Sequence, residues 1–125
     1  MAQDGGVRRI GPEDRSEGGS TPGMARELAL ATDGMWAGLV HTDPGMVSGW
    51  HHHGEYQTSI YVLCGVLRME FGSAGEQTVD ARPGDFLHVA PYAIHREGNP
   101  STAPASAVVV RAGHGDPVIN LAGPA

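Results

Sequence analysis

With 125 residues, the chain fits one small domain with a correspondingly small apolar core. The net charge is −6 and the eight basic residues, all arginine, form no cluster, so a nucleic-acid surface is not expected, and the absence of lysine excludes Schiff-base chemistry. Glycine (19 residues) and proline (9 residues) are frequent, which favours many short strands joined by turns over long helices.

Cysteine content and hydropathy bear on the location of the protein. The single cysteine, Cys64, excludes an intrachain disulfide and is compatible with a reducing compartment. No window approaches the length of a membrane span, and the first residues lack the apolar run of a signal peptide. We therefore expect a soluble, cytoplasmic protein that binds no membrane.

The first part of the chain differs in composition from the rest. Residues 1–23 are polar, rich in glycine and without apolar periodicity, which predicts a flexible N-terminal arm. Residues 24–125 are predicted to form a single domain. Within that domain, residues 25–31 are compatible with either a short strand or one helical turn.

From residue 35 onward, apolar runs alternate with turn residues. Strands are predicted at 35–41, 46–53, 58–64, 66–71, 77–81, 86–90, from 95, at 107–111 and at 118–121. The segments between them carry turn chemistry, such as Asp-Pro-Gly ending at Gly45 and Pro-Gly-Asp ending at Asp85. Eight or nine short strands without a long helix predict an all-β fold, either a small antiparallel barrel or a two-sheet sandwich.

Three consecutive histidines lie within the predicted strand 46–53. Successive side chains of a strand point to opposite faces, so His51 and His53 project together while His52 points away. Two imidazoles on one face can bind one divalent ion. His95, which follows a Pro-Gly-Asp turn and another apolar strand, strengthens this otherwise weak signal.

Two longer motifs resemble those of the cupin superfamily, in particular its small single-domain members. The first is Gly45-x5-His51-x-His53-x4-Thr58-x6-Gly65, and the second is Gly84-x5-Ala90-x-Tyr92-x2-His95-x3-Asn99. The resemblance covers roughly residues 35–112. It implies a double-stranded β-helix (jelly-roll) barrel with a metal ion at its mouth, bound by His51, His53 and His95.

The motifs depart from the family pattern at three positions. By its spacing to Gly65, the family's carboxylate ligand falls on Thr58, which is a poor metal ligand. A shorter spacing from His53 places Gln57 there instead, and its amide oxygen could coordinate. Ala90 and Tyr92 replace the family's proline and glycine, so Tyr92 occupies a turn position where glycine is usual and could carry backbone strain or a functional hydroxyl.

The missing carboxylate affects the chemistry that the resemblance implies. Three neutral imidazoles leave the charge of a divalent ion uncompensated, which favours an anionic or bidentate oxygen ligand. The donor set is compatible with Zn, Fe(II), Ni, Cu or Mn and does not select among them.

Five further residues are candidates for roles at the site. Glu55 is the nearest general base to the histidines and is the predicted catalytic residue. Tyr61, His88 and Tyr92 are candidates for substrate binding. Arg68 joins them if its side chain faces inward, where it would suit an anionic substrate.

Three functions remain open at this stage. The first is a metal-dependent enzyme, a dioxygenase or an isomerase, acting on a small carboxylated or oxygen-rich metabolite. The second is a small-ligand-binding or regulatory cupin without turnover. The third follows from the Trp-His-His-His-Gly-Glu block, residues 50–55, which resembles small zinc cupins that assist a synthetase-like partner in forming N–N bonds. Because cupins often pair through edge strands, we also expect a homodimer, with the N-terminal arm as a candidate for strand exchange.

Overall fold

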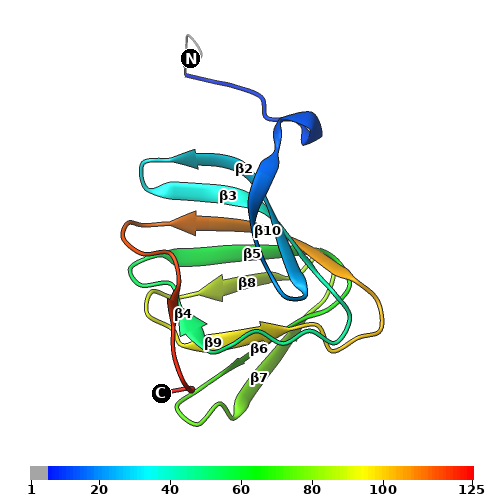
Figure 1. Cartoon of the computed structure of the whole chain (residues 1–125), viewed down its shortest axis with the longest axis vertical. Coiled ribbons are helices and arrows are strands. Elements are labelled where there is room, and N and C mark those ends of the chain that lie inside the picture. The colour runs from blue at the N-terminus through cyan, green and yellow to red at the C-terminus, as the bar shows by residue number, and fades with distance from the viewer. Residues whose placement is uncertain (1–5) are drawn as a thin grey trace.

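The alternating apolar residues and glycine-rich turns produce eleven strands in residues 6–125, the part of the chain that this computed structural model describes (Figure 1). The strands are β1 (Ser16–Thr21), β2 (Met24–Thr32), β3 (Met35–Thr42), β4 (His51–His52), β5 (Gln57–Cys64), β6 (Leu67–Phe71), β7 (Gln77–Ala81), β8 (Phe86–Val89), β9 (His95–Gly98), β10 (Ala105–Ala112) and β11 (Ile119–Asn120). The described helical structure is the 3-10 turn η1 (Pro12–Asp14), and no helix within residues 6–125 has the length and apolar character needed to cross a membrane.

The strands form two antiparallel sheets. The first sheet has the order β1-β2-β3-β10-β5-β8, and the second has the order β11-β4-β9-β6-β7. Strands far apart in the sequence are therefore neighbours: β10 pairs with both β3 and β5 (Figure 1). This topology confirms the predicted all-β, double-stranded β-helix fold.

The apolar core lies between the two sheets and follows the strand alternation. In β5, Thr58, Ile60 and Val62 are buried while Ser59 and Leu63 are exposed. The same alternation in the other strands, together with Met46 from the segment before β4, gives the buried apolar core, which consists of Met24, Val40, Met46, Ile60, Val62, Leu67, Met69, Ala81, Val89, Ala107 and Val109. Every second side chain on an inner strand thus faces a common interior.

Most predicted strands agree with the observed ones to within a few residues, and two segments differ. Residues 25–31, which sequence reasoning left undecided, belong to the nine-residue strand β2. The predicted strand 46–53 is regular only at β4, whereas Val47 makes an isolated bridge to Gly98 and the Ser48 amide donates to the Glu97 carbonyl. Gly45 and Gly49 flank this stretch, and glycine weakens regular pairing.

The predicted N-terminal arm contains a strand. Residues 16–21 form β1, which pairs with β2 at the edge of the first sheet, so the sheet begins before the boundary expected at residue 23. The reason is a tight turn at Gly23, whose φ of 78° is accessible to glycine and lets β1 fold back onto β2. Residues 1–5 of the predicted arm lie outside the described residues.

Candidate metal centre

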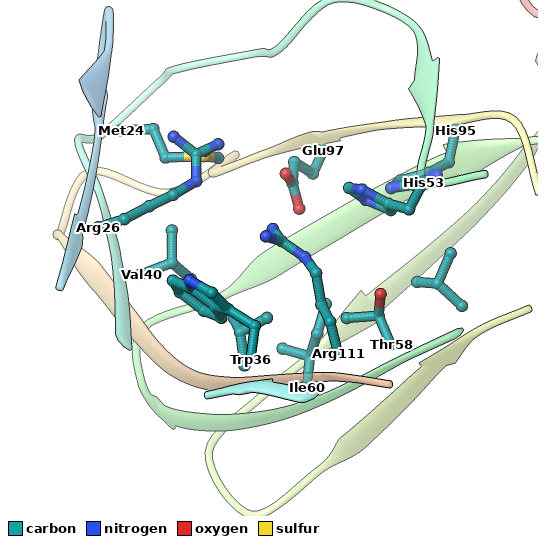
Figure 2. A pocket seen from close by; sticks show the side chains of 12 residues that line it. Met24, Arg26, Trp36, Val40, His53, Thr58, Ile60, His95, Glu97 and Arg111 are labelled. Atoms are coloured by element: carbon teal, nitrogen blue, oxygen red, sulfur yellow. The ribbon is translucent and has the colours of Figure 1, made fainter. Parts of the chain in front are cut away.

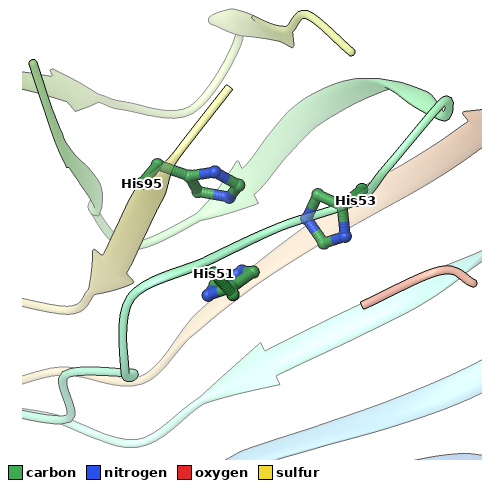
Figure 3. A group of neighbouring side chains, drawn as sticks. All are labelled: His51, His53 and His95. Carbon is green, nitrogen blue, oxygen red and sulfur yellow. The ribbon is translucent and has the colours of Figure 1, made fainter. Parts of the chain in front are cut away.

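The three predicted histidine ligands converge in space. His51 lies on β4, His53 directly follows that strand, and His95 opens β9, where its Cα is paired with that of His51 (Figure 3). The ring centroids are 4.4 Å apart for His51 and His95, 5.0 Å for His51 and His53, and 5.2 Å for His53 and His95. One ring nitrogen from each lies within 4.8 Å of the others, a spacing that can hold a single metal ion.

Backbone carbonyls determine which ring nitrogen of each histidine is free. The Nδ1 atom of His51 is 2.9 Å from the Gly49 oxygen, that of His53 is 2.6 Å from the Pro117 oxygen, and that of His95 is 2.9 Å from the Ala93 oxygen. A carbonyl oxygen only accepts, so each Nδ1 carries the proton and donates it. The three Nε2 atoms are left with lone pairs, which is the tautomer that a metal ligand requires.

Burial favours the neutral form of two of these imidazoles, those of His53 and His95. Desolvation lowers the pKa of His53 from 6.5 to about 3, against the opposing effect of its hydrogen bond to Pro117. Desolvation also lowers the pKa of His95. Neutral imidazole is the coordinating form, so neither His53 nor His95 has to lose a proton near neutral pH before a metal ion binds.

A backbone hydrogen bond joins the two loops that carry the ligands. The Tyr92 amide donates to the Gly54 carbonyl over 2.9 Å, and the Gly54 amide donates to His52 Nδ1, also over 2.9 Å. Both Gly54 and Tyr92 have positive φ angles, of 57° and 61°. The conformation predicted for Tyr92 is therefore present, and His52 points away from the other two histidines, as predicted.

The donor set fits a divalent transition metal. Three buried nitrogen donors with uniform tautomers match the preferences of Zn, Fe(II), Ni or Mn, without selecting among them. Glu97 supplies a carboxylate close by: its Oε1 lies 3.9 Å from His51 Nε2. The predicted site thus has an acidic neighbour, although from β9 rather than from the first motif.

Two of the three histidines, His53 and His95, border a narrow cavity inside the barrel. This inner cavity has a volume of about 20 Å³ (Figure 2). Its polar lining includes Glu97, Arg111 and Thr58, and the Arg111 guanidinium lies over the Trp36 ring at 5.0 Å from its centroid. The Thr58 hydroxyl is buried without a hydrogen-bond partner among the described residues.

A wider outer cavity adjoins the inner one. Its volume is about 270 Å³, and Arg26, His53 and Glu97 border both cavities. His51 and the surface residues Val118 and Asn120 complete its mouth. A small molecule entering from solvent would therefore meet the histidines and Glu97 before it reached Arg111.

The structure does not bring Gln57 to the histidines. Thr58 is the residue that faces inward, and Gln57 is exposed on the other face, where its Oε1 lies 3.1 Å from His88 Nε2. Adjacent strand residues point to opposite faces, and no bulge reverses the order here. The Gln57 ligand assignment is corrected accordingly.

Two of the predicted substrate contacts also lie on outer faces. Arg68 alternates with the buried Leu67 and Met69, and its guanidinium makes two hydrogen bonds to Asp80, at 2.7 and 3.0 Å. Tyr61 stacks against the exposed ring of Phe86 at 4.7 Å. Neither residue borders the inner or the outer cavity, because both have the outward strand parity.

The remaining predicted residues lie at the periphery. Glu55 is exposed, with its carboxylate beside Gly115 on the C-terminal loop, and does not line the cavities next to the histidines. Tyr92 is 61% exposed and packs against His52, with 5.8 Å between the ring centroids. His88 lines another, mainly apolar cavity of about 260 Å³, which His95 also borders. Glu55 and Tyr92 lie in the turns at Gly54 and Pro91, whereas His88 alternates with the buried Val89 on β8 and so has the outward parity.

Sequence reasoning missed Glu97, Arg111 and Arg26, although strand parity could have found them. Glu97 is two residues after His95 on β9, so it shares the inward face. Arg111 continues the buried series Ala107, Val109 on β10. Arg26 likewise follows the buried Met24 on β2.

Comparisons with known proteins agree with this fold. A family model described as a cupin domain matches residues 38–111. The structure is similar to KdgF from Halomonas sp., with a TM-score of 0.73 and 19% identity over 88% of this chain and 96% of that one. It is also similar to an uncharacterized conserved protein with a double-stranded β-helix domain from Klebsiella pneumoniae, with a TM-score of 0.70 and 22% identity over 82% and 87% of the two chains.

A third similar structure is oxalate decarboxylase from Bacillus subtilis, with a TM-score of 0.69 and 22% identity over 82% of this chain but only 28% of that one. At these identities the likeness concerns the fold alone. No curated protein sequence matches the chain. The family model covers more than half of the chain, including both histidine motifs, so this chain belongs to the cupin family.

Proposed function

We propose that this protein is a metal-dependent enzyme that acts on a small carboxylated or oxygen-rich metabolite by oxygenation or isomerisation. The observation that carries the proposal is the cluster of three buried histidines with free Nε2 atoms at the junction of two cavities. A divalent ion bound by these histidines would supply Lewis acidity and, if redox-active, electron transfer.

The side chains around the cluster support chemistry rather than a purely structural ion. A structural site is closed by four protein ligands, whereas here three histidines border open cavities. Trp36, Ile60 and Val109 provide apolar walls that limit water on the inner side. Among residues 6–125, Glu97 is the only carboxylate that lines the two cavities, which supports Glu97, rather than Glu55, as the group that exchanges a proton with a bound molecule.

Elemental analysis of protein purified without oxygen tests the proposal. We expect close to one divalent metal ion per chain, and its loss in a His95→Ala variant that keeps the wild-type circular dichroism spectrum. Replacing His114, an exposed histidine that contacts Asp33, with Ala provides the matched control and should leave the metal content unchanged. Wild-type protein that holds no stoichiometric metal under these conditions would overturn the proposal.

Oxygen consumption then separates the two reaction types and the alternatives. Uptake of dioxygen with small hydroxy or keto acids supports oxygenation, whereas anaerobic substrate conversion supports isomerisation. Metal-loaded protein that binds such acids without turnover would instead fit a ligand-binding cupin. A zinc-only protein active solely beside a synthetase-like partner would fit the N–N bond-forming group.

The expected homodimer remains a proposal. The strands β1 and β8 form the two edges of the first sheet, and an edge strand can pair with a second copy. Sedimentation velocity of the full chain and of a chain shortened through residue 21 tests whether β1 is needed: we expect a dimer that dissociates when β1 is removed.

A further inference from the structure

We propose that Arg111 is the anchor for a carboxylate group, so that the ligand of this protein is a small acid carrying a second oxygen donor for the histidine cluster. The inference rests on the proposed function and narrows its substrate class. Arg111 lies outside both histidine motifs. It takes the anion-binding role that was predicted for Arg68, whose side chain faces outward.

Arg111 is held inside the barrel without a direct ion pair among the described residues, and Glu97 is the carboxylate whose charge acts on it. Arg111 projects from β10 into the inner cavity beside Glu97 and stacks on Trp36 (Figure 2). Its Nε is buried without a hydrogen-bond partner, and within residues 6–125 no carboxylate lies within 4.0 Å of its guanidinium nitrogens. Burial also lowers the pKa of Arg111, which means that its surroundings disfavour the charged form.

An arginine in this state is costly to the fold unless something binds it. The two arginines of the second sheet, by contrast, form ion pairs: Arg68 pairs with Asp80, and Arg96 pairs with Glu70. A guanidinium presents its donors as a planar fork that matches a carboxylate. The unused donors of Arg111 therefore define a binding site for an oxyanion.

The charges around the cavities favour an anion. Arg26 and Arg111 each contribute +1 and Glu97 contributes −1, so these three side chains give the lining a net charge of +1 before any metal ion binds. The chain as a whole has a net charge of −6. A positive cavity in an acidic protein attracts anions to that place in preference to the rest of the surface.

The cavity volumes limit how the acid fits. The inner cavity, of about 20 Å³, has room for one or two water molecules, which is about the size of a carboxylate group. The outer cavity, of about 270 Å³, has room for the body of a small metabolite. The carboxylate thus reaches inward to Arg111, and the remaining oxygen donors stay beside the histidines and Arg26.

Matched chelating probes test the assignment on Co(II)-loaded full-length protein. The probes are the monohydroxamates of malonic, succinic and glutaric acid, each compared with the analogue in which a carboxamide replaces the carboxylate. Isothermal titration calorimetry and the cobalt absorption spectrum report binding. We expect at least one carboxylate probe to bind 10- to 100-fold more tightly than its carboxamide partner, which is the range for charge-assisted hydrogen bonds.

The Arg111→Met variant should abolish this difference and leave carboxamide binding and cobalt content unchanged. Arg111→Lys keeps the charge but lacks the planar pair of donors, so it should retain only part of the affinity difference between the carboxylate and carboxamide probes. If Arg111→Met does not fold, Arg111→Lys provides the test instead. The matched control is Arg68→Met, an outward arginine, which should behave like wild type.

The possible failures are distinguishable. If wild-type protein binds neither cobalt nor the carboxamide probes, the proposed function fails and this inference fails with it. If cobalt and carboxamide probes bind but no carboxylate probe gains affinity, or the gain survives in Arg111→Met, the metal site stands and only the role of Arg111 is overturned.

Discussion

Replacing Arg111 with Met should make the metal-free protein more stable. The guanidinium lies in the barrel with a buried, unpartnered Nε and no ion pair among the described residues. Met keeps the contacts of the aliphatic stem and introduces no unsatisfied donor. A residue that is retained for binding rather than for folding is expected to stabilise the protein when it is replaced.

The structure indicates the size of the effect. A buried donor without a partner costs about 1–3 kcal/mol. Stacking of the Arg111 guanidinium on Trp36, at 5.0 Å from the ring centroid, stabilises the folded protein by about 0.5–2 kcal/mol, and attraction to Glu97 offsets a further part of the cost of the unpartnered donor. We therefore expect the free energy of unfolding to rise by up to about 1 kcal/mol, which corresponds to at most about 3–5 °C in Tm for a domain of this size.

Urea unfolding of chelator-treated protein, followed by circular dichroism, measures the change. Metal and ligands must be absent because either one stabilises the folded state by mass action. Arg68→Met is the control with the opposite expected sign: it removes a surface pair with Asp80 and should cost about 0–1 kcal/mol. A loss of more than about 1 kcal/mol in Arg111→Met, at an unchanged m-value, would refute the reasoning and make Arg111 a structural residue.

Three further outcomes follow from the histidine cluster and its loops. His53→Ala should lower metal affinity by at least about 100-fold and leave the circular dichroism spectrum unchanged, since the core lies elsewhere; chelator competition measures this. The unfolding free energy of metal-free protein should fall as the pH drops from about 7 towards 3. The reason is that His53 takes up a proton near pH 6.5 in the unfolded chain, whereas in the folded protein its pKa is about 3. Urea titrations at pH 7 and pH 5 should therefore show a shallower pH dependence of the unfolding free energy in His53→Leu than in wild type. Tyr92→Gly should stabilise the protein by about 0.5–1 kcal/mol by relieving a φ of 61°, whereas Tyr92→Ala should not, as thermal unfolding will show.

Strand parity explains both the successes and the failures of the sequence predictions. Period-two alternation placed His51 and His53 on one face, and the structure confirms this. The same rule applied to Gln57 and Thr58 left two alternatives, because it compares neighbours but does not say which face is inward. The buried Ile60 and Val62 settle that choice in favour of Thr58.

The sequence by itself determined the all-β class, the positions of most strands and the identity of the three histidines, since these depend on residue types and spacings within short segments. The tertiary structure alone decided what surrounds them. The Pro117 carbonyl that orients His53 is 64 residues away in the chain, and Arg111 meets Glu97 across the barrel interior from a different sheet. Such pairings depend on how the two sheets are laid over each other, which local patterns of hydrophobicity do not encode.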